Sequence, residues 1–185
     1  GPDAGPHFAP NVWPETIDGF REAYGEYFGD MSDLARSLMR IFALALDLDE
    51  HFFDDKIDKE ISMLRTLSYP NMGTRIEEGQ MRAGAHTDFD CLTMVFQQEG
   101  QGGLQVSPGR GTEGKGEERA WYSVTPKDGL ITCNIGDMLM RWSDARLKST
   151  LHRVRMPRPG ESRGARYSMA FFCQANKDEI IQGPE

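Results

Sequence analysis

The first third of the chain repeats apolar positions with a helical period. Between residues 15 and 46, apolar side chains recur at steps of three and four, which predicts one long helix with an apolar stripe running from Ile17 to Ala45. Residues 55–64 place Ile57, Ile61 and Leu64 at the same spacing, so we expect a second, shorter helix there. Residues 1–14 are rich in proline and glycine and predict a loop.

The pattern changes after Leu67. Short runs rich in Val, Ile, Thr, Phe and Leu are interrupted by Gly, Pro and Asp, which is typical of a β-sandwich or barrel. Two polar interruptions stand out: residues 71–80, which we expect to border a site as a lid, and residues 107–119, which predict a glycine-rich hairpin tip. The chain is therefore expected to be mainly β with flanking helices.

Composition limits the possible functions. The 185 residues are enough for one domain with a core, and 38% hydrophobic with 27% charged residues is ordinary for a globular protein. A net charge of −8 without any Lys/Arg block argues against nucleic acid or an anionic membrane as partner. No apolar run approaches the ~20 residues that span a bilayer, and no signal peptide is recognised.

Cysteine usage indicates a reducing compartment. Cys91, Cys133 and Cys173 each lie in an apparent strand, and an odd count without a short pairing pattern predicts reduced core thiols. We therefore expect a cytoplasmic protein. As separate expectations, its partner is a small molecule and it is a monomer or a weak dimer.

The most informative local pattern is His86-Thr87-Asp88 with His152 further along. Side chains alternate faces along a strand, so His86 and Asp88 point the same way and Thr87 points away. Two imidazoles and one carboxylate can occupy one face of an octahedral iron(II) and leave the other face open. His152 is far from Asp88 in sequence, so it must come from another strand of a folded-over sheet, which requires a barrel.

A second pattern places a cation inside the same barrel. Alternation from Arg166 sets Ser168, Phe172 and Gln174 on its face. An inward guanidinium without a partner is costly, so Arg166 requires an anion, which a forked arginine and a serine hydroxyl can bind together.

These patterns belong to a longer resemblance. Residues 67–176 resemble the core of the iron(II)/2-oxoglutarate-dependent dioxygenases, on the branch that includes isopenicillin N synthase. The resemblance rests on seven blocks in the order of the family: Ser68-Tyr69-Pro70, residues 83–89, Gly103-Leu104-Gln105-Val106, Trp121 with Val124 and Pro126, Asn134-Ile135-Gly136-Asp137, residues 148–154, and Arg166-Tyr167-Ser168.

The resemblance implies a fold and a set of roles. The fold is a double-stranded β-helix, or jelly roll, over residues 67–176, supported by residues 1–66 with the long helix and followed by a tail, residues 177–185. Iron(II) is expected on His86, Asp88 and His152, with 2-oxoglutarate and O2 as co-substrates. Arg166, Ser168 and Tyr69 are expected to bind 2-oxoglutarate. Thr87, Phe89, Phe172 and Gln174 are expected to border the substrate, although core packing is the alternative for Phe89 and Phe172.

The implied activity is oxidation of an unactivated C–H bond in a small, largely apolar metabolite, in secondary metabolism. Hydroxylation, desaturation, epoxidation and ring closure remain open. One alternative is an oxidase of the isopenicillin N synthase kind, which keeps the three ligands but uses no 2-oxoglutarate. Another is a non-catalytic jelly-roll binding module, against which the intact His-Asp-His set argues.

Overall fold

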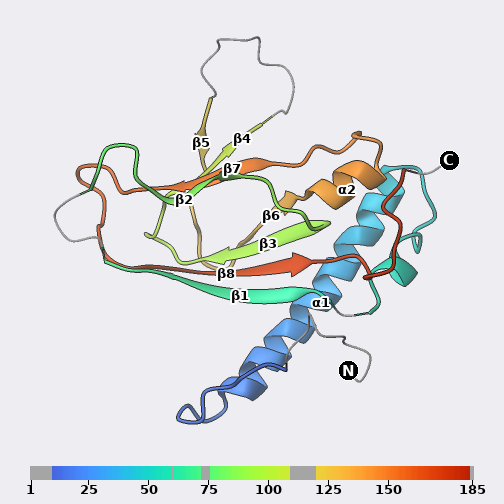
Figure 1. Ribbon diagram of the computed structural model, residues 1–185, viewed down its shortest axis with the longest axis horizontal. Coiled ribbons are helices and arrows are strands. Elements are labelled where there is room, and N and C mark those ends of the chain that lie inside the picture. The colour runs from blue at the N-terminus through green and yellow to red at the C-terminus, as the bar shows by residue number, and fades with distance from the viewer. Residues whose placement is uncertain (1–9, 60, 72–75, 109–119, 184–185) are drawn as a thin grey trace.

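The computed structural model describes residues 10–59, 61–71, 76–108 and 120–183. Two antiparallel four-stranded sheets form the body of this part of the chain, and one long helix, α1, runs diagonally across one end of the molecule (Figure 1). The expectation of a mainly β protein with flanking helices is confirmed. Of the segment expected to act as a lid, residues 71–80, the part 72–75 lies outside the described residues, and of the expected hairpin tip, residues 107–119, the part 109–119 does.

Helix α1 spans Phe20–Ala45 and begins later than its apolar pattern predicts. Gly19 precedes it with φ 72°, a left-handed conformation that favours glycine and separates residues 15–18 from the helix. The buried face is formed by Met31, Ala35, Met39 and Ala43. Leu34 and Ile41, which the apolar stripe placed inward, are 37% and 59% exposed.

The predicted helix at residues 55–64 is wrong. Only a single 3-10 turn, η1 (Asp54–Lys56), forms there, and Leu64 already belongs to a strand. The cause is a long-range contact. The backbone N–H of Asn176 donates to the carbonyl of Lys56 over 2.7 Å, and the side-chain amide of Asn176 donates to the Asp55 carbonyl and the Asp58 carboxylate. Two of these bonds occupy the carbonyls of Asp55 and Lys56, which a helix would use for its own hydrogen bonds.

Consecutive strands belong to different sheets, except β4 and β5, which are both in the second sheet. The first sheet has the order β1-β8-β3-β6 and the second the order β2-β7-β4-β5, with every pair antiparallel. In chain order the strands are β1 (Met63–Tyr69), β2 (Met81–His86), β3 (Leu92–Gln97), β4 (Leu104–Ser107), β5 (Tyr122–Ser123), β6 (Ile131–Ile135), β7 (Leu151–Arg155) and β8 (Arg166–Cys173), with the short helix α2 (Asp137–Trp142) between β6 and β7.

The two faces of the first sheet have different roles. Residues directly opposite in antiparallel strands point the same way, so Thr93 shares a face with Phe172 and Asn134, and Gln97 shares it with Ser168. The other face carries Leu64, Met94 and Phe171, which pack with buried residues of α1 in one hydrophobic core. Polar groups therefore face the second sheet, and apolar groups face the helix.

The cysteines are all unpaired, as expected. Cys91 and Cys173 are buried, but Cys133 is exposed, so it is not the core thiol that its strand position predicted. Within the described residues, no helix is both long enough and apolar enough to cross a bilayer.

Candidate metal centre and anion pocket

Three predicted ligands converge between the two sheets. His86 ends β2, His152 lies in β7 directly opposite it, and Asp88 follows β2 by two residues. Nε2 of His86 lies 3.7 Å from Oδ1 of Asp88, and Nε2 of His152 lies 3.6 Å from Oδ2. One ligand atom from each residue falls within 4.8 Å of the others. This spacing suits a metal ion held between the three side chains.

Both imidazoles are oriented by backbone carbonyls. Nδ1 of His86 lies 2.7 Å from the carbonyl of Gly84, and Nδ1 of His152 lies 2.9 Å from the carbonyl of Thr150. A carbonyl can only accept, so each Nδ1 carries the proton and each Nε2 presents a lone pair toward Asp88. Metal-binding histidines are commonly fixed in this way. The donor set therefore fits a divalent metal such as iron(II).

Asp88 is buried and receives hydrogen bonds at one oxygen. The Thr93 hydroxyl and the Asn134 side-chain amide donate to Oδ2 over 2.6 and 2.9 Å. The same hydroxyl lies 2.8 Å from Oδ2 of Asp90. A hydroxyl has one proton, so both of its carboxylate contacts are hydrogen bonds only when Asp90 is protonated. Burial raises the pKa of Asp90 to about 7, in agreement with this arrangement.

The turn between β6 and α2 is hydrogen-bonded to the backbone of residues 88–91, the segment that begins with Asp88. The N–H groups of Gly136, Asp137 and Met138 donate to the carbonyls of Cys91, Asp88 and Asp90 over 3.1, 2.8 and 3.1 Å. A Cβ on Gly136 would lie 2.1 Å from the Asp90 carbonyl oxygen, so only glycine permits this approach. The block Asn134-Ile135-Gly136-Asp137 thus fixes the backbone that carries Asp88.

Arg166 is 2% exposed and points into the same interior. Its guanidinium donates to Oε1 of Gln97 over 2.9 Å, to Oγ of Ser168 over 3.2 Å and to the carbonyl of Gln101 over 3.2 Å. Over the described ranges, no carboxylate forms a salt bridge with it. A buried cation with only neutral partners can bind an anionic ligand.

Tyr69 and Arg82 lie near this guanidinium. The Tyr69 ring centroid is 5.2 Å from Cζ of Arg166, so the cation faces the aromatic ring. Burial lowers the pKa of Arg166, and the positive charge of Arg82 lowers it further, while Tyr69 opposes both effects. Arg82 donates to the carbonyl of Gly164 over 2.9 Å. The pocket therefore has an excess of positive charge.

The predicted substrate residues differ in their surroundings. Phe89 is 80% exposed, which excludes core packing for it. The Thr87 hydroxyl donates to Oδ2 of Asp137 over 3.2 Å. Phe172 is half-buried beside Thr93 on the interior face, under the guanidinium of Arg65 at 5.5 Å. Gln174 follows β8, and its backbone N–H donates to Oγ of Ser62 over 3.2 Å.

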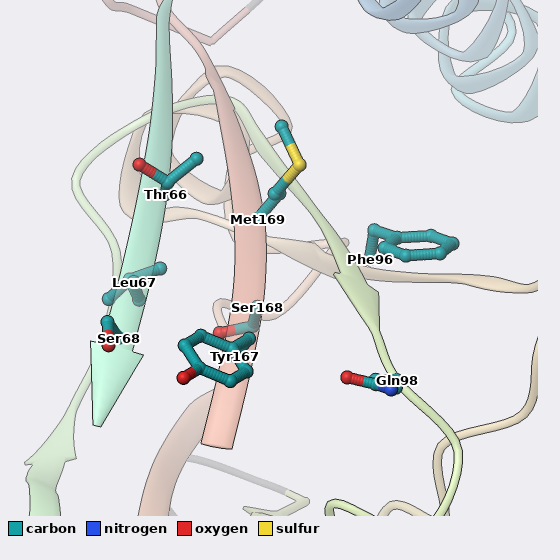
Figure 2. Close-up of a pocket in the computed structure, with 8 residues that line it drawn as sticks. All are labelled: Thr66, Leu67, Ser68, Phe96, Gln98, Tyr167, Ser168 and Met169. Atoms are coloured by element: carbon teal, nitrogen blue, oxygen red, sulfur yellow. The ribbon is translucent and has the colours of Figure 1, made fainter. Parts of the chain in front are cut away.

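An apolar cavity of about 380 Å³ touches Ser168 but lies mainly outside this site. It is lined by side chains of three neighbouring strands, β1, β8 and β3, including Thr66, Tyr167, Met169 and Phe96 (Figure 2). Tyr167 and Met169 alternate along β8 with Arg166 and Ser168, so these side chains lie on the opposite face of the sheet from the guanidinium.

Sequence reasoning missed three polar residues of the site. Gln97 contacts Arg166, and Thr93 and Asn134 contact Asp88. A signal for two of them is present: Thr93 and Gln97 lie four residues apart in an otherwise apolar strand, on one face of it. Asn134 belongs to a recognised block, but its sequence does not indicate what it contacts.

Comparison with known proteins gives a consistent result. The sequence model of the 2OG-Fe(II) oxygenase superfamily matches residues 60–175. The chain is 36% identical, over 177 residues, to the 2-oxoglutarate-Fe(II) type oxidoreductase hxnY of Emericella nidulans, covering 94% of this chain and 47% of that protein. It is 35% identical to homoarginine-6-hydroxylase 2-ODD-C23.1 of Arabidopsis thaliana, covering 94% of this chain and 49% of that protein.

The structural comparison agrees. The crystal structure of full-length Neurospora crassa T7H in complex with alpha-KG superposes with a TM-score of 0.83 at 35% identity, covering 95% of this chain and 56% of that one. The chain spans about half the length of the curated relatives that it matches.

Proposed function

The chain belongs to the 2OG-Fe(II) oxygenase superfamily, and from this premise we propose that it is the core of an iron(II)- and 2-oxoglutarate-dependent dioxygenase acting on a small molecule. One observation carries the proposal. The three converging ligands and the buried Arg166 face the same interior, so a metal and an anion can be bound side by side. Relatives named for their activities include a validamycin A dioxygenase and a homoarginine-6-hydroxylase.

We propose that the fold is a double-stranded β-helix. The strand orders β1-β8-β3-β6 and β2-β7-β4-β5, with the chain crossing from one sheet to the other, support this topology. Such an arrangement places His86 and His152 of one sheet opposite Arg166 of the other, with Asp88 in the connection between β2 and β3. It also explains why a ligand far along the sequence reaches the same point.

In this proposal, His86, Asp88 and His152 hold iron(II), which when bound supplies the redox chemistry that activates O2. Nδ1–H of each histidine stays on a backbone carbonyl, which keeps both Nε2 lone pairs available. The guanidinium of Arg166, with the Ser168 hydroxyl beside it and Tyr69 over it, binds the distal carboxylate of 2-oxoglutarate. These residues orient the co-substrate before reaction.

The substrate is proposed to lie near Phe172, with Thr87, Phe89 and Gln174 as further candidate contacts. Phe172 offers an apolar surface on the interior face, which supports a small, largely apolar metabolite, in keeping with secondary metabolism. Hydroxylation, desaturation, epoxidation and ring closure differ only in where the oxidised carbon is held, and the four residues are compatible with each.

The test is iron-dependent conversion of 2-oxoglutarate. Purified protein supplied with iron(II), O2 and 2-oxoglutarate should form succinate, faster when a substrate is present, and zinc should not replace iron because it has no accessible redox step. Asp88→Ala should abolish succinate formation, whereas replacement of the exposed Asp178 should leave it unchanged. Substrate oxidation without 2-oxoglutarate and without succinate would instead identify an oxidase.

A further inference from the structure

The hydrogen bonds at Asp88 distinguish its two carboxylate oxygens. Oδ2 accepts from Oγ1 of Thr93 over 2.6 Å and from Nδ2 of Asn134 over 2.9 Å. Oδ1 lies 3.7 Å from Nε2 of His86 and Oδ2 lies 3.6 Å from Nε2 of His152, but among the described residues hydrogen-bond donors contact Oδ2 and not Oδ1. A carboxylate oxygen has two in-plane lone pairs, so two donors occupy Oδ2 and leave Oδ1 available.

From this geometry we propose that Thr93 and Asn134 are positioning residues that restrict Asp88 to one metal-binding oxygen, Oδ1. The inference rests on the proposed function, because it concerns the metal of that site. Both donors come from strands of the first sheet, Thr93 from β3 and Asn134 from β6, and the two are register partners. A pair of neighbouring strands therefore presents two donors to a single oxygen.

The surroundings fix both donors. Thr93 is 2% exposed and Asp88 is 8% exposed, so water does not compete freely for Oδ2. Asn134 directly precedes the clamped turn, in which the N–H of Asp137 donates to the carbonyl of Asp88 over 2.8 Å. The carboxylate and its amide donor are thus connected through backbone as well as side chain. Loss of one donor would leave a lone pair of Oδ2 available for metal binding beside Oδ1.

Metal affinity is the measurement that tests this role. Cobalt(II), a redox-stable probe, is titrated into metal-free protein, and the dissociation constant and visible absorption are recorded. Thr93→Val removes the hydroxyl at constant shape, and Thr93→Ser keeps it. Asn134→Leu removes the amide. We expect Thr93→Val and Asn134→Leu each to weaken cobalt(II) binding about 10- to 100-fold and to change the absorption, and Thr93→Ser to stay close to wild type.

The control is Thr66→Val, the same chemical change on the opposite face of the sheet, which should leave binding unchanged. Wild-type affinity and spectrum in folded Thr93→Val and Asn134→Leu would overturn the inference, as would a loss in Thr93→Ser equal to that in Thr93→Val. If Thr93→Val does not fold, the cobalt(II) affinity and spectrum of Asn134→Leu, compared with those of wild type and Thr93→Ser, test the inference instead. Absence of cobalt(II) binding in the wild type would instead contradict the proposed function.

Discussion

Nη2 of Arg166 donates to Oε1 of Gln97 over 2.9 Å, between two neighbouring strands of the first sheet. Both side chains are 2% exposed. The bond holds one edge of the guanidinium against β3, and Nη1 is directed to Ser168 on its own strand. An arginine fixed in this way can bind a carboxylate without first losing side-chain freedom.

Replacement of Arg166 by leucine should weaken the binding of 2-oxoglutarate. Leu keeps much of the bulk but removes the charge, and loss of one partner from a buried charged pair costs ~2–5 kcal/mol, or roughly 30-fold or more in affinity. The measurement is the KM for 2-oxoglutarate from succinate formation. A shorter 2-oxoacid that does not reach Arg166 should be used equally by both proteins. An unchanged KM for 2-oxoglutarate would show that Arg166 does not bind the co-substrate.

Gln97→Leu should have a smaller effect of the same kind. The guanidinium keeps its charge, and with it the main attraction for a carboxylate, but it loses a charge-assisted bond that holds it in place. Ordering a freed side chain on binding costs ~0.5–1.5 kcal/mol, so KM for 2-oxoglutarate should rise about 2- to 10-fold with little change in metal affinity. Gln182→Leu is the matched control, since Gln182 is exposed and lies beyond the last strand. Equal effects of the two substitutions would argue against a role for the Gln97 bond.

Phe172→Ala should separate substrate binding from stability. Phe172 is half-buried on the interior face, so its truncation should raise KM for substrate while slow, substrate-independent succinate formation persists. Its neighbour Phe171 is 1% exposed and its ring lies 5.4 Å from that of Phe28, so Phe171→Ala should cost ~3–5 kcal/mol of stability. If Phe172→Ala lowers Tm as much as Phe171→Ala, Phe172 is a core residue.

The convergence of the site could be predicted from local patterns. Alternation places Arg166 with Ser168, because both lie in β8 and a strand fixes side-chain direction over two residues. His86 and Asp88 also converge as predicted, but Asp88 lies beyond the end of β2, so strand alternation does not account for that pair. The contacts of Thr93 and Asn134 could not be predicted, because they depend on the register between β3 and β6. The register between two strands depends on contacts that are distant in sequence, so it cannot be inferred from a single sequence.

The incorrect prediction of a helix at residues 55–64 also results from long-range contacts. Ile57, Ile61 and Leu64 have helical spacing, but Leu64 pairs with Phe171 of β8 and is held in a strand. The bonds from Asn176 to the segment around Lys56 join residues more than a hundred positions apart. Such tertiary contacts outweigh the weak helical propensity of a short segment.

Asp54→Asn should make the protein less stable at neutral pH but not in acid. Hydrogen bonds from Arg40, and then from His51, lower the pKa of Asp54 from 3.8 to about 2. A lowered pKa stabilises the folded state above the unfolded value of 3.8, and this contribution is lost as pH falls through about 2. Wild type should therefore exceed the variant in Tm by a few degrees at pH 7.

The difference in Tm should shrink below pH 4 and disappear near pH 2. Thermal unfolding followed by circular dichroism across this range gives the comparison, with Asp178→Asn as an exposed control that should match wild type throughout. A difference between Asp54→Asn and wild type that is the same at pH 7 and pH 2 would show that the Arg40 pair does not provide the stabilisation.

The most direct test of the central proposal is anaerobic titration of the iron(II)-loaded protein with 2-oxoglutarate, monitored by the visible metal-to-ligand charge-transfer band. A 2-oxoacid that chelates iron(II) produces this band, so it reports the metal and the co-substrate in one site. The proposal predicts a saturable band in wild type, a weaker apparent affinity in Arg166→Leu and no band in Asp88→Ala. Absence of the band in folded wild-type protein with iron(II) bound, or its persistence in Asp88→Ala, would contradict the assignment.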